Sequence, residues 1–154
     1  MLTVFLKNAQ LLSEKFGITP LLYGSLGLEL RTGEALYADD IDILIPEVFL
    51  NARWEAFKTL LEADGYRLTD LHEHTFEKDG VYCSYASIEN LHPFAGIHLS
   101  EIPSCEENGV RFLLLTLQQY RCVYAASSKD GYRAEVRGKK DAEKIAVIDR
   151  HLQK

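Results

Sequence analysis

The chain has 154 residues, of which 47% are hydrophobic and 26% are charged, and its formal net charge is −6. Length and composition predict one folded domain over residues 1–154 with a core of its own, and the ordinary content of glycine and proline does not indicate a disordered chain. The negative charge argues against a protein that grips duplex nucleic acid, because such proteins carry a basic stripe. Here the longest basic cluster runs from Arg133 to Lys140 and contains Glu135.

The cysteines and the apolar runs bear on the compartment. Cys83, Cys105 and Cys122 are odd in number and lack the spacing of metal ligands, which predicts free thiols in a reducing compartment. No signal peptide is evident, and no apolar run approaches the ~20 residues that a membrane-spanning helix needs. We therefore expect a cytoplasmic protein without a membrane span. The sequence leaves its oligomeric state open.

Apolar periodicity and turn residues predict the elements in chain order. The first half should contain a helix over residues 3–16 ended by Gly17, a strand over 21–23, a helix over 25–31, a strand over 41–45 and an amphipathic helix over 48–63. The second half should contain a strand over 66–71, a hairpin of 75–76 with 81–87, short strands near 97–99 and 110–113, and helices over 116–127 and 139–152. This order predicts an α+β (α/β) fold, a small mixed sheet flanked by helices.

Two segments near the first strands carry most of the functional signal. Gly24-Ser25 lies at a strand-to-helix turn, and fourteen residues separate Ser25 from Asp40. Asp40 and Asp42 alternate with apolar residues, so both carboxylates should project from one face of a strand. Two carboxylates on one face are oxygen ligands suited to Mg²⁺, and backbone N–H groups at a helix N-terminus suit a triphosphate. The alternatives are a solvated acidic strand end and a turn in which Ser25 caps the helix.

In this order, the two segments resemble the nucleotidyltransferase superfamily, and most of all its branch of lincosamide nucleotidyltransferases and AbiEii-type toxins. The resemblance extends to the segment over residues 113–120 and to a late Lys-Asp element at Lys140-Asp141. It implies a nucleotidyltransferase-like fold, a nucleoside triphosphate bound at Gly24, Ser25 and Lys140, and Mg²⁺ (or Mn²⁺) held by Asp40 and Asp42 as the catalytic acids.

The resemblance also exposes a departure. The superfamily carries a third carboxylate on a later strand, and Ser84 stands at that position here. Serine cannot serve as a general base at neutral pH. Glu77 and Glu89 are the nearest substitutes along the sequence, and surface charge is the simpler interpretation of each.

Three further groups leave alternatives open. Lys140, Asp141 and Lys144 form either the charged first turn of a helix or a lysine site near phosphate. His72 and His74 would share one face of a strand, where an exposed edge is a better interpretation than a zinc site. A set of aromatic residues should form core or pocket wall: Tyr82, Tyr85, Phe94, Tyr120 and Tyr124.

Two functions follow from the resemblance and the residues. The first is Mg²⁺-dependent transfer of a nucleoside monophosphate from a nucleoside triphosphate to an unidentified acceptor hydroxyl. The second is a catalytically degenerate nucleotidyltransferase fold that acts as a nucleotide-binding or regulatory module, which Ser84 favours. A plain partner-binding domain remains only if the Gly-Ser turn and the acids lie far apart.

Overall fold

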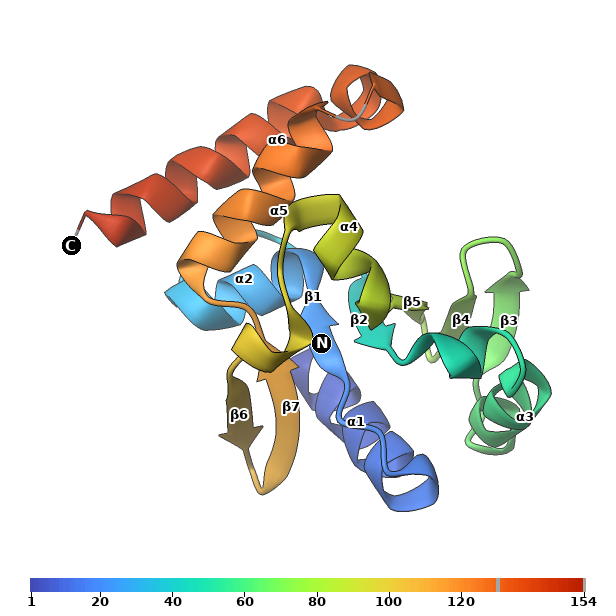
Figure 1. The fold of residues 1–154 in the computed structure, drawn as a ribbon. Helices are drawn as coiled ribbons and strands as arrows, with labels where there is room; N and C mark the ends of the chain where they lie inside the picture. Colours follow the sequence, from blue (N-terminus) through green and yellow to red (C-terminus); the bar gives the residue numbers. More distant parts are fainter. Residues whose placement is uncertain (130, 154) are drawn as a thin grey trace.

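The computed structural model describes residues 1–129 and 131–153, with the side chains of 131–137 outside what it describes. The helices are α1 (Leu2–Phe16), α2 (Gly24–Thr32), α3 (Trp54–Ala63), α4 (Leu91–Ala95), α5 (Leu117–Lys129) and α6 (Gly131–Leu152), with short helical turns η1 (Glu47–Leu50), η2 (Ile88–Asn90) and η3 (Leu99–Glu101). The strands are β1 (Leu21–Tyr23), β2 (Ile41–Ile45), β3 (Arg67–Asp70), β4 (Thr75–Lys78), β5 (Val81–Ser87), β6 (Ser104–Glu107) and β7 (Val110–Leu114). The mixed sheet flanked by helices confirms the predicted α+β fold class (Figure 1).

All these strands form one sheet in the order β3-β4-β5-β2-β1-β7-β6. β2 runs antiparallel to β1 and parallel to β5, and β1 runs parallel to β7. The register places Tyr23 opposite Asp42, Asp42 opposite Ser84, and Ser84 opposite Thr75. Residues paired across strands point to the same face, so this register forms one row of side chains across four strands.

One face of the sheet is closed by α1 and α3. Phe57 of α3 lies against Tyr85 of β5 at 5.0 Å between ring centroids and against Phe76 of β4 at 6.4 Å. Phe5 of α1 meets Phe112 of β7 edge to face at 5.2 Å. All five of these rings are buried, and these aromatic contacts explain why Ile41, Ile43 and Ile45 of β2 and Cys83 of β5 are buried on the same face.

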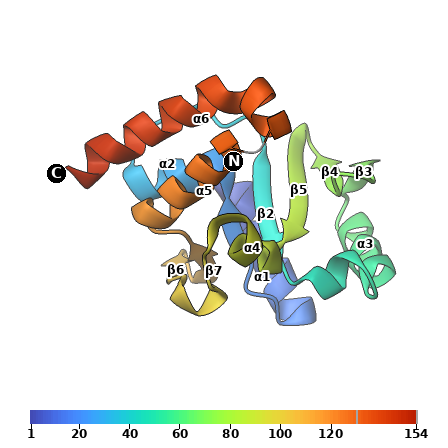
Figure 2. The ribbon, with the colours of Figure 1, turned by 45° about the horizontal axis from the view of Figure 1, so that its top comes forward.

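The other face carries α5 and α6, which lie beside each other and away from α1 (Figures 1 and 2). α5 begins at Leu117, one residue after the predicted start, and Thr116 caps it: Gln119 N donates to Thr116 Oγ1 at 3.1 Å, and Thr116 N donates to Gln119 Oε1 at 3.0 Å. This reciprocal cap satisfies two backbone groups at the helix start.

Within the described residues, no helix is both long and apolar enough to cross a membrane.

Local signals predicted most boundaries, and three predictions were wrong. The predicted helix over 48–63 is broken, because Phe49 turns into the core against Phe16, 5.1 Å away between ring centroids, and only α3 continues as an α-helix. No strand forms at 97–99. The His98 backbone N–H donates to Glu101 Oε1 at 3.3 Å there, and the helical turn η3 begins at the next residue. The segment around His72 and His74 is a turn between β3 and β4, not a strand.

Two elements extend beyond the predictions. The final helix begins at Gly131, before the predicted residue 139. β6, which pairs antiparallel with β7, was not predicted at all.

Candidate functional site

The turn from β1 into α2 lies directly against Asp42. Gly24 has a φ of 65°, in the left-handed region that favours glycine. A Cβ at Gly24 would lie 3.2 Å from Asp42 Cγ and would collide with its carboxylate. A residue with a side chain would therefore strain the backbone and displace Asp42. The helix begins at Gly24 after Tyr23 with no side-chain cap, so Ser25 is not the capping residue.

Tyr120 forms hydrogen bonds to the backbone of this turn. Its hydroxyl lies 3.2 Å from the carbonyl oxygen of Gly24 and 3.4 Å from that of Leu22, and it donates to this pair of acceptors. Gly27 leaves room for the ring, since a Cβ there would lie 2.6 Å from the Leu22 oxygen and would strike the Tyr120 hydroxyl. Burial raises the pKa of Tyr120 well above its usual range, so the phenol keeps the proton that it donates.

The two predicted acids lie at the start of β2. Asp42 is half-buried within the strand, and Asp40 is exposed immediately before it. Ser84 is the residue paired with Asp42 on β5, so the structure places it next to the acids as expected. Its hydroxyl is bonded to Thr75 Oγ1 at 2.7 Å. Two hydroxyl groups, those of Ser84 and Thr75, therefore lie beside Asp42, where the family resemblance implies a third carboxylate.

Neither proposed replacement acid reaches this row. Glu77 lies 3.3 Å from the Arg67 guanidinium and accepts from Gly80 N at 2.9 Å. Glu89 accepts from the Glu47 backbone N–H at 3.0 Å. Both lie outside the cavity described below. Among the side chains that the structure describes, no group of three or more His, Cys, Asp or Glu residues is placed to hold a metal ion.

The late Lys-Asp element faces the sheet from within α6. Asp141 is buried and accepts a hydrogen bond from Ser127 of α5 at 2.8 Å, while Lys140 is exposed beside it. Lys144 Nζ lies 5.7 Å from the ring centroid of Tyr124. The interpretation as a first helical turn is therefore wrong, because α6 starts at Gly131. Most of the basic cluster from 133 to 140 lies outside the described side chains.

A cavity of about 1130 Å³ joins these pieces. All five residues proposed from the sequence line it: Gly24, Ser25, Asp40, Asp42 and Lys140. Ser84, Asp141 and Lys144 line it too, together with Glu47 after β2 and Asn90 after β5. Its volume lies slightly above the roughly 300–1,000 Å³ typical of small-molecule sites, and its carboxylates, hydroxyls and lysines are suited to a polar, charged ligand.

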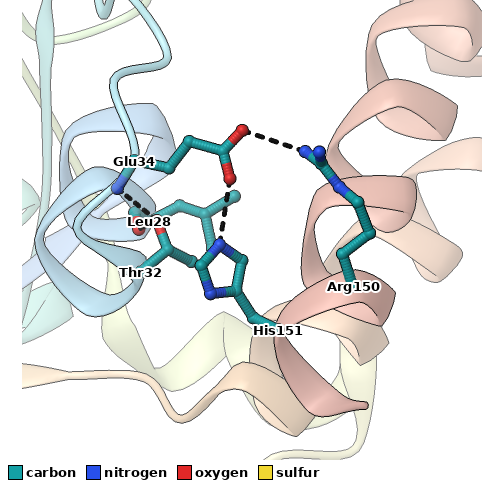
Figure 3. Close-up of polar contacts among 5 residues, drawn as sticks. All are labelled: Leu28, Thr32, Glu34, Arg150 and His151. Carbon is teal, nitrogen blue, oxygen red and sulfur yellow. Dashed lines mark hydrogen bonds and ion pairs between the residues drawn. The ribbon is translucent and has the colours of Figure 1, made fainter. Parts of the chain in front are cut away.

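The loop from α2 to β2 forms one rim, and sequence reasoning missed how it is held. Glu29 Oε1 accepts from the backbone N–H groups of Leu36 at 2.9 Å and Ala38 at 3.0 Å. Glu34 bonds Arg150 and His151 near the end of α6, each at 2.9 Å (Figure 3). The hydrogen bond from His151 and the Arg150 guanidinium hold the pKa of Glu34 below its usual range, although desolvation opposes them. No sequence signal marks these partners, since Glu34 and His151 are 117 positions apart.

Comparison with known proteins gives a relative in sequence and similar solved structures. The uncharacterized protein YnaI of Bacillus subtilis (strain 168) is 40% identical over 149 residues, which cover 97% of this chain and 96% of that protein. The solution structure of the antibiotic-resistance factor ANT(2'')-Ia matches with a TM-score of 0.58 and 16% identity, over 97% of this chain and 84% of the other. The crystal structure of ANT(2'')-Ia in complex with adenylyl-2''-tobramycin matches with the same TM-score and identity, and the match covers 99% of this chain and 90% of the other. No protein-family model matches the chain.

Proposed function

Since this chain belongs to the family of the Bacillus subtilis protein YnaI and adopts the fold of the nucleotidyltransferase ANT(2'')-Ia, we propose that it is a nucleotidyltransferase. It would transfer a nucleoside monophosphate from a nucleoside triphosphate to an acceptor hydroxyl. The supporting observation is the contact between the Gly24 turn and Asp42 at the wall of a polar cavity.

The donor set fits Mg²⁺ or Mn²⁺. Mg²⁺ is bound in phosphate-transfer sites by one or two carboxylates together with substrate phosphates and water, so Asp40 and Asp42 suffice without a third protein ligand. The missing Cβ at Gly24 leaves room for the Asp42 carboxylate. When bound, the ion would neutralise charge on the reacting phosphates and orient them.

The protein's own residues would position the substrate. The N–H groups at the start of α2, at Gly24 and Ser25, would bind the terminal phosphates, as helix N-termini bind anions. Lys140 would add a point charge from α6. Tyr120 would keep the turn in place through its bond to the Gly24 carbonyl oxygen. The expected contribution of these groups is positioning and charge neutralisation.

The finer assignments belong to the same proposal. The sequence resemblance favours the lincosamide and AbiEii-type branch of the superfamily. ANT(2'')-Ia has been crystallised in complex with adenylyl-2''-tobramycin, which is tobramycin that carries an adenylyl group. For the present chain we propose a small acceptor that fits the cavity. The three free thiols are in keeping with a cytoplasmic location.

A second function is favoured by one observation. Ser84 and Thr75 are bonded to each other beside Asp42, and no third carboxylate converges there among the described residues. A fold can keep its ligand site after one catalytic group is lost. The alternative is therefore a nucleotide-binding or regulatory module without transfer activity.

Both functions require a site that binds a metal ion and a nucleotide, and metal-dependent stabilisation of the fold tests that site. A ligand at one hundred times its Kd stabilises the native state by about 2.7 kcal/mol, so Mg²⁺ with a nucleoside triphosphate should raise the melting temperature. We expect the Asp42→Asn variant to lose this response. Asp79→Asn, in the turn between β4 and β5, removes one charge outside the cavity and should keep it. An equal response from Asp42→Asn and the wild type would overturn the proposed site.

Transfer itself separates the two functions. Wild-type protein would be incubated with each α-labelled nucleoside triphosphate, Mg²⁺ and a small-molecule extract, and labelled products would be resolved by chromatography. Label in a new product that is absent with Asp42→Asn supports the enzyme. Tight nucleotide binding with no transferred label supports the binding module.

A further inference from the structure

Tyr37, on the loop between α2 and β2, is an aromatic residue at the rim of the cavity that no sequence pattern singled out. We propose that the Tyr37 ring stacks on the base of the bound nucleotide. The inference rests on the proposed function and extends it to a part of the ligand that the acids and the Gly24 turn do not contact.

The exposure of Tyr37 is the first observation. Its side chain is 87% exposed, more than any other exposed large hydrophobic residue in the described part of the chain, where Leu71 follows at 62%. It nevertheless lines the cavity that contains Asp40 and Asp42. A large ring left in water beside a polar cavity has an open π face, and stacking on a base would cover it.

The backbone at Tyr37 is the second observation. Its φ is 55°, a left-handed conformation that residues with large side chains rarely adopt. Such conformations persist where surrounding contacts impose them, and they concentrate at ligand sites. The ring thus projects from a backbone that an unrestrained tyrosine would leave.

The restraining contacts are built into the loop. The two N–H groups that flank Tyr37, those of Leu36 and Ala38, both donate to one oxygen of Glu29. Upstream, Glu34 ties the loop to Arg150 and His151 of α6 (Figure 3). The ring is therefore presented by a loop that is fixed before any ligand arrives, which lowers the entropy lost on binding.

Charge selects the base as the group that Tyr37 meets. Asp39 lies on the same loop and is not a proposed metal ligand, so its carboxylate repels phosphate groups. The neutral, planar part of a nucleotide carries no such penalty. Three chain positions separate Tyr37 from Asp40, a span of at most about 11 Å, so the ring stays near the acids that would hold the metal ion.

Stacking uses a π face that every nucleobase has, so the contact should tolerate all four bases. A base-to-aromatic stack contributes enough that its loss should weaken binding by at least ~5-fold and at most ~150-fold. Tyr37→Phe keeps the ring and should bind like the wild type. Tyr37→Asn removes the ring but suits the left-handed backbone, so it separates loss of stacking from collapse of the loop.

The experiment is calorimetric titration of the full chain with Mg²⁺ and ATP, GTP, CTP or UTP, and in parallel with Mg²⁺ and tripolyphosphate. We expect Tyr37→Ala and Tyr37→Asn to weaken binding of the nucleotides within that range and to leave the affinity for tripolyphosphate unchanged. Tyr82→Ala is the matched control, because Tyr82 is an exposed ring outside the cavity.

Three results would count against the proposal. Unchanged nucleotide affinity in Tyr37→Asn would overturn it and leave the proposed function intact, even if the acceptor then bound more weakly. Equal losses for nucleotide and tripolyphosphate would show that Tyr37 acts through the phosphate site and not through the base. Wild-type protein that binds no nucleotide at all would remove the proposed function, and stacking with it.

Discussion

The two faces of the sheet are built on opposite principles. The face under α1 and α3 is closed by aromatic rings, with Phe57, Phe76 and Tyr85 in mutual contact. The face under α5 and α6 places Asp42, Ser84 and Lys140 around a cavity of about 1130 Å³. Alternation along β2 and β5 serves both, since successive residues go to opposite faces. The closed face supplies the stability that allows the open face to hold polar groups in fixed positions.

The largest effect should come from the closed face. Phe57→Ala removes a fully buried ring at the centre of the aromatic cluster and should lower the free energy of unfolding by about 3–5 kcal/mol. Urea unfolding measures the loss. Tyr82→Ala, which removes an exposed ring, should change it by less than about 0.5 kcal/mol. A loss below ~1 kcal/mol for Phe57→Ala would mean that this face is not the stable one.

A smaller effect should come from the wall of the open face. Ser127→Ala leaves the buried Asp141 carboxyl without its hydroxyl donor and should cost about 1–3 kcal/mol in unfolding free energy. Ser128→Ala is the matched control, because the Ser128 hydroxyl donates to the Ala125 carbonyl oxygen within its own helix. Equal losses in the two variants would show that the bond between α5 and α6 contributes nothing specific.

The smallest effect should come from the rim, and it should depend on pH. The pKa of Glu34 is lowered in the fold by its bond to His151 and by Arg150. A lowered pKa means that the ionised carboxylate stabilises the fold above the ordinary value of 4.5, and that this stability is lost as pH falls through the folded pKa.

Melting temperatures from neutral pH down to about pH 3 test this titration. The wild type should melt above Glu34→Gln near neutrality, and the difference should vanish in acid. Glu55→Gln, on an exposed part of α3, should show no such trend. A difference that grows as the pH falls would reverse the sign expected here.

What the sequence could predict depends on the range of the interactions that decide each feature. Gly17, Gly33 and Gly80 take positive φ at the ends of α1, of α2 and in the hairpin turn, and such local signals predicted these boundaries. The Gly24 turn and the Asp42 strand were also identified from local patterns, and the sheet register then brings them together.

The features that the sequence did not predict depend on contacts between distant positions. Phe49 breaks the helix expected over 48–63 because it packs on Phe16, far away in the chain. The unusual backbone of Tyr37 is fixed by the Glu29 carboxylate, and the buried Asp141 accepts a hydrogen bond from Ser127 of the preceding helix. Neither partner is indicated by spacing or periodicity.

The bond from Tyr120 to the Gly24 carbonyl has a consequence for the order of folding. These residues are 96 positions apart, and β1 pairs in parallel with β7, with Leu21 opposite Leu113. Distant pairings of this kind form late, because the entropy cost of closing a long loop comes before the stabilising contacts are made. During synthesis the Gly24 turn is made early, but its support emerges only with α5. A nascent or truncated chain that ends before α5 would carry the whole Gly-Ser and Asp-x-Asp pattern without the support that shapes it.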